Sequence, residues 1–438
     1  MRWIGLAGVI VIFAIAYLFS ANRRAIRWYT VLWGFSLQVL FAFLVLYWEA
    51  GKNALERFSM AITGAISYAD QGGSFVFGWL TGRMEKVGQA TGLPIGGYIF
   101  AFKVLPIIIF IASFFTIMYY LGIMQKIVQG MAWVMQRLMK VSGAESLAVA
   151  ANVFIGQTEA PILIAPYIPT MTRSEILTMM TGGMAHVSGA VLLAYVAMGI
   201  PAKYLITASV MAAPGAIMMA KILMPETEVP VTMGKVTLKV EKTHTNLIDA
   251  AASGASQGMT LVINIVAMLI AFIALIALLN GFLGWVGGLF GYPGFQLQQV
   301  FAWVLWPLAV VMGVPIPDAG TVADLIGNKT VINEFFAYAK MSTVQAGMSE
   351  KARLIASFAL CGFANFSSIG IQIGGIGGLA PTRKGDIARL GFRALLGGPG
   401  RAFSASSTPA PPFSGGSAIE CLPWGWSWAR AWAPSPSG

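Results

Sequence analysis

Two glutamates, Glu159 and Glu334, lie in segments whose other residues are mostly apolar. Glu159 sits between two short apolar stretches, and Glu334 follows a mixed stretch that is also flanked by apolar residues. An ionised carboxylate is costly to bury unless it is paired or has a function. The two glutamates are therefore the first candidates for a buried polar site.

The polar residues that accompany these glutamates carry amides and hydroxyls. They are Gln157, Thr158, Asn365, Ser367 and Ser368. Carboxylates accept hydrogen bonds from sugar hydroxyls, and side-chain amides pair with a base edge because they both donate and accept. The set suits a neutral, hydroxyl-rich solute. Lys and Arg are nearly absent from these segments, with Lys329 the nearest exception, which argues against an anionic substrate.

The segments that carry these side chains do not resemble ordinary membrane spans. Residues 144–170 hold two short apolar pieces around a polar turn, which predicts a re-entrant helical hairpin. Residues 297–339 predict a second hairpin, with Pro315–Asn333 as its polar centre. Each hairpin precedes an interrupted span, over residues 174–199 and 352–379. Hairpin tips and broken helices leave backbone groups unpaired, so such segments need a ligand, an ion or a neighbouring segment.

The composition explains why membrane structure is expected. Hydrophobic residues make up 57% of the 438 residues and charged residues 10%, whereas a soluble domain has about 25% charged residues. So few charges exclude a soluble enzyme, a nucleic-acid binder and a disordered scaffold, and they predict an all-α polytopic membrane protein. The net charge of +11 then reflects basic cytoplasmic loops. No nucleic-acid partner is expected.

The two halves of the chain share a pattern. Gly183-Met184-Ala185-His186-Val187-Ser188 in the first interrupted span matches Gly362-Phe363-Ala364-Asn365-Phe366-Ser367 in the second. Three spans separate the copies if the first broken helix is counted (174–199, 202–223 and 260–282), and a hairpin returns the chain to its own side. The second broken helix therefore crosses in the opposite direction. Inverted repeats with paired discontinuous helices are typical of secondary transporters.

Three motifs resemble the signatures of the concentrative nucleoside transporter family. They are Gly156-Gln157-Thr158-Glu159-Ala160-Pro161, Asn333-Glu334-Phe335 and Gly362-Phe363-Ala364-Asn365-Phe366-Ser367-Ser368, and the agreement covers residues 1–396 in order and spacing. The resemblance implies a multi-pass protein of the bacterial inner membrane that imports nucleosides by cation symport and needs no cofactor. It also implies a homotrimer in which a transport domain moves against a scaffold domain by an elevator mechanism.

The same resemblance implies the residues of the substrate site. The nucleobase is expected to bind the first hairpin, with one residue of the following broken helix lining that side: Gln157, Thr158, Glu159 and Val191. The ribose is expected to bind residues from the second hairpin and the later broken helix: Glu334, Asn365 and Ser368, with Phe363 packed nearby.

The family's sodium site matches four positions: Asn152, Ile155, His186 and Val187. His186 is a departure, because sodium-coupled relatives resembling this sequence carry a small hydroxyl residue there. Histidine is a poor ligand for a hard cation, which prefers oxygen. Its carbonyl is still an oxygen ligand, and its imidazole titrates near neutral pH. Sodium is the expected coupling ion, and the proton, carried by His186, is the alternative.

Apolar runs at residues 3–19, 28–48 and 98–121 are expected to span the membrane, whereas residues 52–92 are expected to form an amphipathic or interfacial stretch. The expected domain organisation follows the repeat. The segments are N-terminal scaffold helices with an interfacial helix (1–122), the first half of the transport domain (123–224), a loop and scaffold span (225–295), the second half (296–396) and an atypical tail (397–438). The tail is rich in Pro, Gly and Ser. A helix that begins near Asp386 is expected to be stopped by Pro399, Pro409, Pro411 and Pro412. A shifted reading frame would explain the change in composition after residue 396. It predicts an irregular tail, and it leaves open whether this chain transports a substrate.

Two functions from other classes compete with a symporter. A membrane-embedded enzyme needs a nucleophile or metal cluster at the interface, yet the chain has only 2 His and 2 Cys. A channel needs a continuous polar face along several helices, whereas the polar residues here are confined to breaks. The sequence does not distinguish purine from pyrimidine nucleosides, nor does it fix the number of coupled ions.

Overall fold

The computed structural model describes residues 2–46, 48–81, 99–234 and 244–406, and within these ranges the chain forms helices and turns without a strand. Four helical segments are long and apolar enough to cross a membrane, or up to six spans if two sharply bent helix pairs each count as one. The predicted all-α polytopic fold class is confirmed by this architecture.

The N-terminal helices are α1 (Arg2–Leu18), α2 (Trp28–Leu46), α3 (Glu49–Phe77), η2 (Gly78–Thr81), α5 (Phe100–Lys103) and α6 (Leu105–Tyr120), with the short turn η1 (Arg23–Ala25) between the first two. The predicted apolar runs form α1, α2 and α6. The stretch expected to be amphipathic, residues 52–92, forms the single long helix α3 as far as Phe77; residues 82–92 lie outside the described ranges.

The first half of the repeat consists of α7 (Ile123–Met139), α8 (Gly143–Asn152), η3 (Ala160–Thr170), α9 (Arg173–Ala185), α10 (Gly189–Ala197) and α11 (Ala202–Leu223). The first hairpin has one α-helical arm, α8, and one 3₁₀ arm, η3. Pro161, Pro166 and Pro169 lie in η3, and each removes a backbone donor that an α-helix would need. The α9–α10 span breaks at His186–Ser188.

The second half follows the long helix α12 (Leu247–Leu289). Its elements are α13 (Leu297–Val311), α14 (Ile316–Val331), α15 (Glu334–Val344), η4 (Gln345–Gly347), α16 (Glu350–Leu360), α17 (Phe366–Leu379), η5 (Pro381–Arg383) and α18 (Lys384–Ser406). The second hairpin is α14 followed by α15, so Pro315–Asn333 is mostly its first arm and not its polar centre. The chain bends by 119° between α13 and α14, which makes α13 a separate helix.

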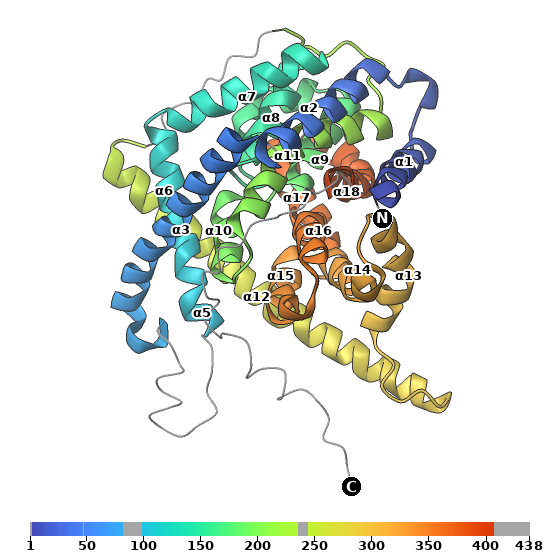
Figure 1. The fold of residues 1–438 in the computed structure, drawn as a ribbon. Coiled ribbons are helices and arrows are strands. Elements are labelled where there is room, and N and C mark those ends of the chain that lie inside the picture. Colours follow the sequence, from blue (N-terminus) through green and yellow to red (C-terminus); the bar gives the residue numbers. More distant parts are fainter. Residues whose placement is uncertain (1, 47, 82–98, 235–243, 407–438) are drawn as a thin grey trace.

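The last helix is longer than expected. α18 continues past Pro399 and ends at Ser406, so the first of the four prolines does not stop the helix; the other three lie outside the described residues. A proline in a membrane helix is tolerated where neighbouring helices satisfy the freed backbone groups, and α18 packs against α9, α11, α16 and α17. Figure 1 shows α18 between α9 and α1, both of which it contacts. The tail from residue 407 onward lies outside the described residues.

Glycines set the approach of two other helices. Gly254 and Gly258 on α12 face α6, where an added Cβ would lie 2.6 Å from Thr116 Oγ1 and 2.8 Å from the Ile109 Cα, respectively. Small residues four apart permit such close backbone packing in membranes. Ser113 Oγ also donates to the Ala251 carbonyl at 2.8 Å. The α6–α12 pair therefore forms a tightly packed unit.

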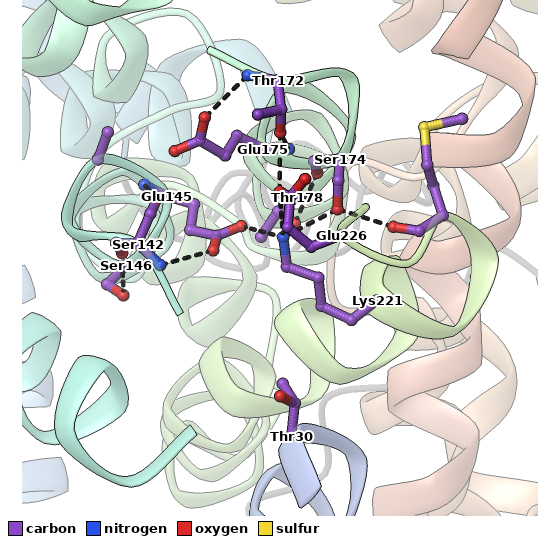
Figure 2. Close-up of polar contacts among 12 residues, drawn as sticks. Thr30, Ser142, Glu145, Ser146, Thr172, Ser174, Glu175, Thr178, Lys221 and Glu226 are labelled. Atoms are coloured by element: carbon purple, nitrogen blue, oxygen red, sulfur yellow. Dashed lines mark hydrogen bonds and ion pairs between the residues drawn. The ribbon is translucent and has the colours of Figure 1, made fainter. Parts of the chain in front are cut away.

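A buried ion-pair cluster joins the ends of several helices of the first half. Lys221 Nζ lies 2.7 Å from Glu145 Oε2 and 3.5 Å from Glu226 Oε2, and it donates to Ser174 Oγ at 2.9 Å (Figure 2). Glu145 also closes the capping box at the start of α8, as Glu175 does at the start of α9. The cluster thus ties the base of the first hairpin to α9 and α11.

Candidate functional site

The tip of the first hairpin reaches the second broken helix. Gln157 lies between α8 and η3, and its Nε2 donates to Ser368 Oγ on α17 at 3.1 Å. An added Cβ at Gly375, also on α17, would lie 3.0 Å from Thr158 Cγ2. Gln157 is 6% exposed, so this contact is buried. Residues more than two hundred positions apart in the sequence therefore meet at one place.

Asparagine caps position the polar groups of the second half. Asn333 Oδ1 accepts from the Phe336 N–H and starts α15, and Asn365 Oδ1 accepts from the Ser368 N–H and starts α17. Asparagine is a favoured N-cap because its oxygen satisfies an orphan backbone donor. Glu334 is thereby placed in the first turn of α15, where the helix dipole favours a carboxylate.

The carboxylate of Glu334 is the centre of a buried network. Its Oε2 accepts from Asn365 Nδ2 at 3.0 Å, and its Oε1 accepts from the Tyr195 hydroxyl on α10 at 3.2 Å. Glu334 and Asn365 are 4% and 2% exposed. The network therefore contains residues from both halves of the repeat, joined by Tyr195 at one end and Gln157 at the other.

The two helix breaks also touch each other. The Phe363 N–H donates to the His186 carbonyl at 3.1 Å. The Gly189 N–H, just after the first break, donates to the Phe154 carbonyl of the first hairpin at 2.9 Å. The first hairpin, the α9–α10 break and the α16–α17 break thus form one contiguous region.

The other predicted substrate residues lie around this region without joining the network. Val191 is buried near the start of α10, and Phe363 is half-buried in the second break. Glu159 is exposed, and its carboxylate folds over Gly156, where an added Cβ would lie 2.2 Å from Glu159 Oε2. The two glutamates therefore differ: the structure pairs Glu334 with polar partners, while Glu159 lies at the surface of the hairpin tip.

The four positions matched to a sodium site lie in the same region. Asn152 donates its Nδ2 to the Ala148 carbonyl at 2.9 Å, and its buried Oδ1 has no hydrogen-bond partner among the described residues. His186 Nδ1 lies 2.7 Å from the Gly182 carbonyl, and a carbonyl only accepts, so this nitrogen carries the proton. Val187 is buried and Ile155 is half-buried.

Two residues of the site were not predicted from the sequence. Tyr195 lies in an apolar run that suggests only helix packing, and Gln372 is part of a glycine-rich stretch. Gln372 Nε2 donates to Gln157 Oε1 at 3.1 Å and to the Met180 carbonyl at 3.0 Å. Gln372 lies one helical turn after Ser368 on the same face, and this spacing is the signal that would have identified Gln372.

The arrangement offers amide, hydroxyl and carboxylate groups in a buried region between two repeated halves. Such groups bind a neutral polar solute by hydrogen bonds. Within the described part of the chain, no three His, Cys, Asp or Glu residues lie close enough together to hold a metal ion. The fold and the site therefore define a helical membrane protein that handles a polar solute.

Comparisons with known protein families identify this solute class. A model of the Na⁺-dependent nucleoside transporter N-terminus matches residues 7–80, and the corresponding C-terminus model matches residues 204–407. A model named Gate, with the description 'nucleoside recognition', matches residues 101–202. The three matches together cover most of the chain.

Individual relatives agree with the family models. An uncharacterised transporter of Haemophilus influenzae is 45% identical over 89% of this chain and 93% of its own length. The nucleoside permease NupC of Helicobacter pylori is 42% identical over 89% of this chain and 93% of its own length. Human solute carrier family 28 member 3 is 39% identical over 90% of this chain and 58% of its own length.

Solved structures show the same fold. The structure of CNTnw in an inward-facing substrate-bound state is 42% identical, with a TM-score of 0.87, and the match covers 93% of this chain and 97% of that one. A CNTnw variant in an intermediate state gives a TM-score of 0.88 at 43% identity, covering 93% of this chain and 98% of that one. The chain belongs to the Na⁺-dependent, concentrative nucleoside transporter family; it is an integral membrane protein that transports nucleosides and is not an enzyme.

Proposed function

We propose that this protein imports nucleosides by cation symport through a site formed jointly by both halves of the repeat. Glu334, Asn365 and Ser368 bind the ribose, with Phe363 beside it. The nucleobase binds the first hairpin and α10, through Gln157, Thr158, Glu159 and Val191. The observation that carries the proposal is the buried Glu334 network, in which one carboxylate and two amides link the halves.

Sodium is the proposed coupling ion. Asn152 Oδ1 is a buried oxygen without a hydrogen-bond partner among the described residues, and hard cations prefer such oxygens. The carbonyls of Ile155, His186 and Val187 complete the proposed ligand set. The His186 imidazole does not replace them, because a hard cation prefers oxygen to a ring nitrogen; its Nδ1 donates instead to the Gly182 carbonyl. A sodium ion bound here would supply positive charge next to the hairpin tip.

Ser188 supports the sodium proposal in spite of the substitution at position 186. Its hydroxyl is buried and has no hydrogen-bond partner in the described part of the chain, and it lies two residues from His186. Ser188 therefore supplies a hydroxyl oxygen in the same break. Proton coupling through His186 is the alternative, since imidazole titrates in the physiological range.

Transport requires alternating access, and we assign it to movement of residues 123–224 and 296–396 against residues 1–122 and 225–295. The tightly packed α6–α12 pair lies in residues 1–122 and 225–295 and supports the proposal that these residues form a rigid scaffold. The protein is proposed to act as a homotrimer in the bacterial inner membrane.

Uptake of labelled uridine into vesicles that contain the purified protein tests the proposal. With an inward sodium gradient, we expect saturable accumulation above the external concentration. A pH gradient without sodium is the matched condition, and accumulation only under that gradient would assign coupling to protons. Passive equilibration under both gradients would indicate a channel and contradict symport.

A further inference from the structure

Gln372 is a fully buried amide whose role the transport proposal does not use. It lies on α17 one turn after Ser368, is 0% exposed, and forms both its donor hydrogen bonds within the site. One N–H goes to Gln157 Oε1 at 3.1 Å, and the other goes to the Met180 carbonyl on α9 at 3.0 Å. Gln157 in turn donates to Ser368 Oγ.

The backbone of α9 leaves space for this pair of glutamines. An added Cβ at Gly183 would lie 2.8 Å from Gln372 Nε2 and 2.9 Å from Gln157 Cβ. Any larger residue at Gly183 would push the two side chains away. The glycine of the first broken helix therefore keeps both amides in contact.

The Met180 carbonyl fixes the orientation of both amides. A carbonyl only accepts hydrogen bonds, so the group of Gln372 that faces it is the NH₂. The second N–H of that NH₂ points to Gln157, which must then present its oxygen. Gln157 consequently turns its own NH₂ toward Ser368. If the Gln157 amide flipped, two NH₂ groups would face each other and a buried donor would lose its acceptor.

A fixed amide discriminates between nucleobases that differ only in the direction of their hydrogen bonds. Uracil presents a carbonyl acceptor beside an N–H donor, whereas cytosine presents an amine donor beside a ring-nitrogen acceptor. A side-chain amide that flips freely can pair with either edge, because its oxygen and NH₂ exchange places. One that is held in a single orientation pairs well with one edge only.

We infer that Gln372 is a positioning residue that holds the Gln157 amide in one orientation and thereby sets which pyrimidine edge the site prefers. The inference rests on the proposed contact between Gln157 and the nucleobase. It adds to that proposal a specificity determinant on the helix that carries the ribose-binding residues, so that α17 acts on both ends of the nucleoside.

Equilibrium binding of uridine and of cytidine to the purified full-length chain tests the inference. We expect the wild type to bind one of the two at least about threefold more tightly, the factor contributed by roughly one net hydrogen bond. Gln372→Met removes both donors at similar volume and should bring the ratio of the two Kd values toward one. Gln372→Glu presents only acceptors to Gln157, so it favours the flipped amide and should reverse the preference.

Gln38→Met is the matched control. Gln38 is also a buried glutamine, and its Nε2 donates to the Met211 carbonyl at 3.2 Å, outside the site. This variant should keep the wild-type ratio whatever its overall affinity. Gln372→Met introduces no charge and therefore remains informative if Gln372→Glu does not fold.

The results separate this inference from the function on which it rests. A wild-type ratio near one, or an unchanged ratio in Gln372→Met, would overturn the positioning role while uridine binding still supported the transport proposal. Failure of the wild type to bind either nucleoside would instead refute the proposed substrate site.

Discussion

At the residue scale, Glu334 shows how a carboxylate is kept inside a largely apolar protein. Its two oxygens accept from the Asn365 amide and the Tyr195 hydroxyl, and the buried cation of Lys329 adds a favourable charge interaction. Hydrogen-bonded groups of this kind compensate part of the cost of burial. Both oxygens still have lone pairs available, and the hydroxyls of a ribose are suitable donors for them.

Replacing Glu334 with glutamine should weaken uridine binding by about 10- to 100-fold, because hydrogen bonds to a charged acceptor contribute about 1.5–3 kcal/mol. Equilibrium titration of the purified protein measures the change. Asp318→Asn is the matched control, since Asp318 lies on the same hairpin but bonds to Ser349 at an exposed position. Equal losses in the two variants would contradict a direct role for Glu334.

Replacing Asn152 with leucine should abolish the dependence of uridine binding on sodium. Leucine keeps the approximate volume and removes the buried Oδ1 that lacks a partner among the described residues. The measurement is uridine affinity as a function of sodium concentration at constant ionic strength. A variant with the sodium dependence of the wild type would exclude Asn152 as a ligand.

The sequence predicted much of the site and missed its inner contacts. Gln157, Glu334, Asn365 and Ser368 were expected to meet because polar residues are expensive in apolar segments, and the structure joins them in one network. Gln372 could not be assigned, because its role depends on the approach of another hairpin. Glu159 shows the converse: motif and cost suggested a buried group, yet the side chain lies over its own turn.

At the scale of elements, close helix contacts depend on individual glycines. Gly183 lies where α9 meets both the first hairpin and α17. Gly183→Ala should destabilise the fold by about 1–3 kcal/mol through overpacking and weaken uridine binding. Thermal unfolding and binding titrations measure the two effects. Gly378→Ala on α17 meets nothing within 4 Å, so it should leave both properties near those of the wild type; a similar loss there would contradict the packing argument.

The Lys221 cluster should be a major source of stability at the base of the first hairpin. Lys221→Met leaves Glu145 and Glu226 without their cation, and breaking a buried pair costs about 3–5 kcal/mol. We therefore expect a clear fall in the thermal midpoint. Lys340→Met is the comparison, because the Lys340–Asp324 pair is more exposed and such pairs contribute about 1 kcal/mol or less. Equal falls would show that burial of the Lys221 cluster is unimportant.

Element bounds followed the sequence where local signals were strong. The predicted span 202–223 agrees with α11 because Pro201 and Pro225 bracket a continuous apolar run. The bounds of the second hairpin were predicted wrongly, because the spacing of apolar residues in the sequence does not mark the 119° bend between α13 and α14. Pro399, the first of the four prolines expected to stop the last helix, does not end α18, since a proline-containing helix persists when its neighbours pack around it. Tertiary contacts decided the last two of these cases.

At the scale of the whole molecule, α2 and α11 form a contact between the proposed scaffold and the proposed moving part. Beside this contact, Thr30 Oγ1 on α2 donates to the Met139 carbonyl at the end of α7 at 3.0 Å. An added Cβ at Gly34 would lie 2.8 Å from Met218 Cβ. An elevator movement requires this contact to change during each transport cycle.

A cross-link at this contact tests the movement. Gly34→Cys with Met218→Cys places two Cβ atoms within reach of a disulfide after a shift of about 1 Å, in a background where Cys361 and Cys421 are serine. We expect oxidation to block uridine uptake while uridine binding persists, and reduction to restore uptake. Undiminished uptake by the fully cross-linked protein would show that the two parts do not move relative to each other.

In the proposed site, one nucleoside is held by both halves of the repeat at once. An experimental structure of the protein determined with uridine bound tests this arrangement. We expect the nucleoside to lie between the hairpins, with its base against Gln157 and its ribose against Glu334. Uridine bound elsewhere, or contacting residues of only one half, would contradict it.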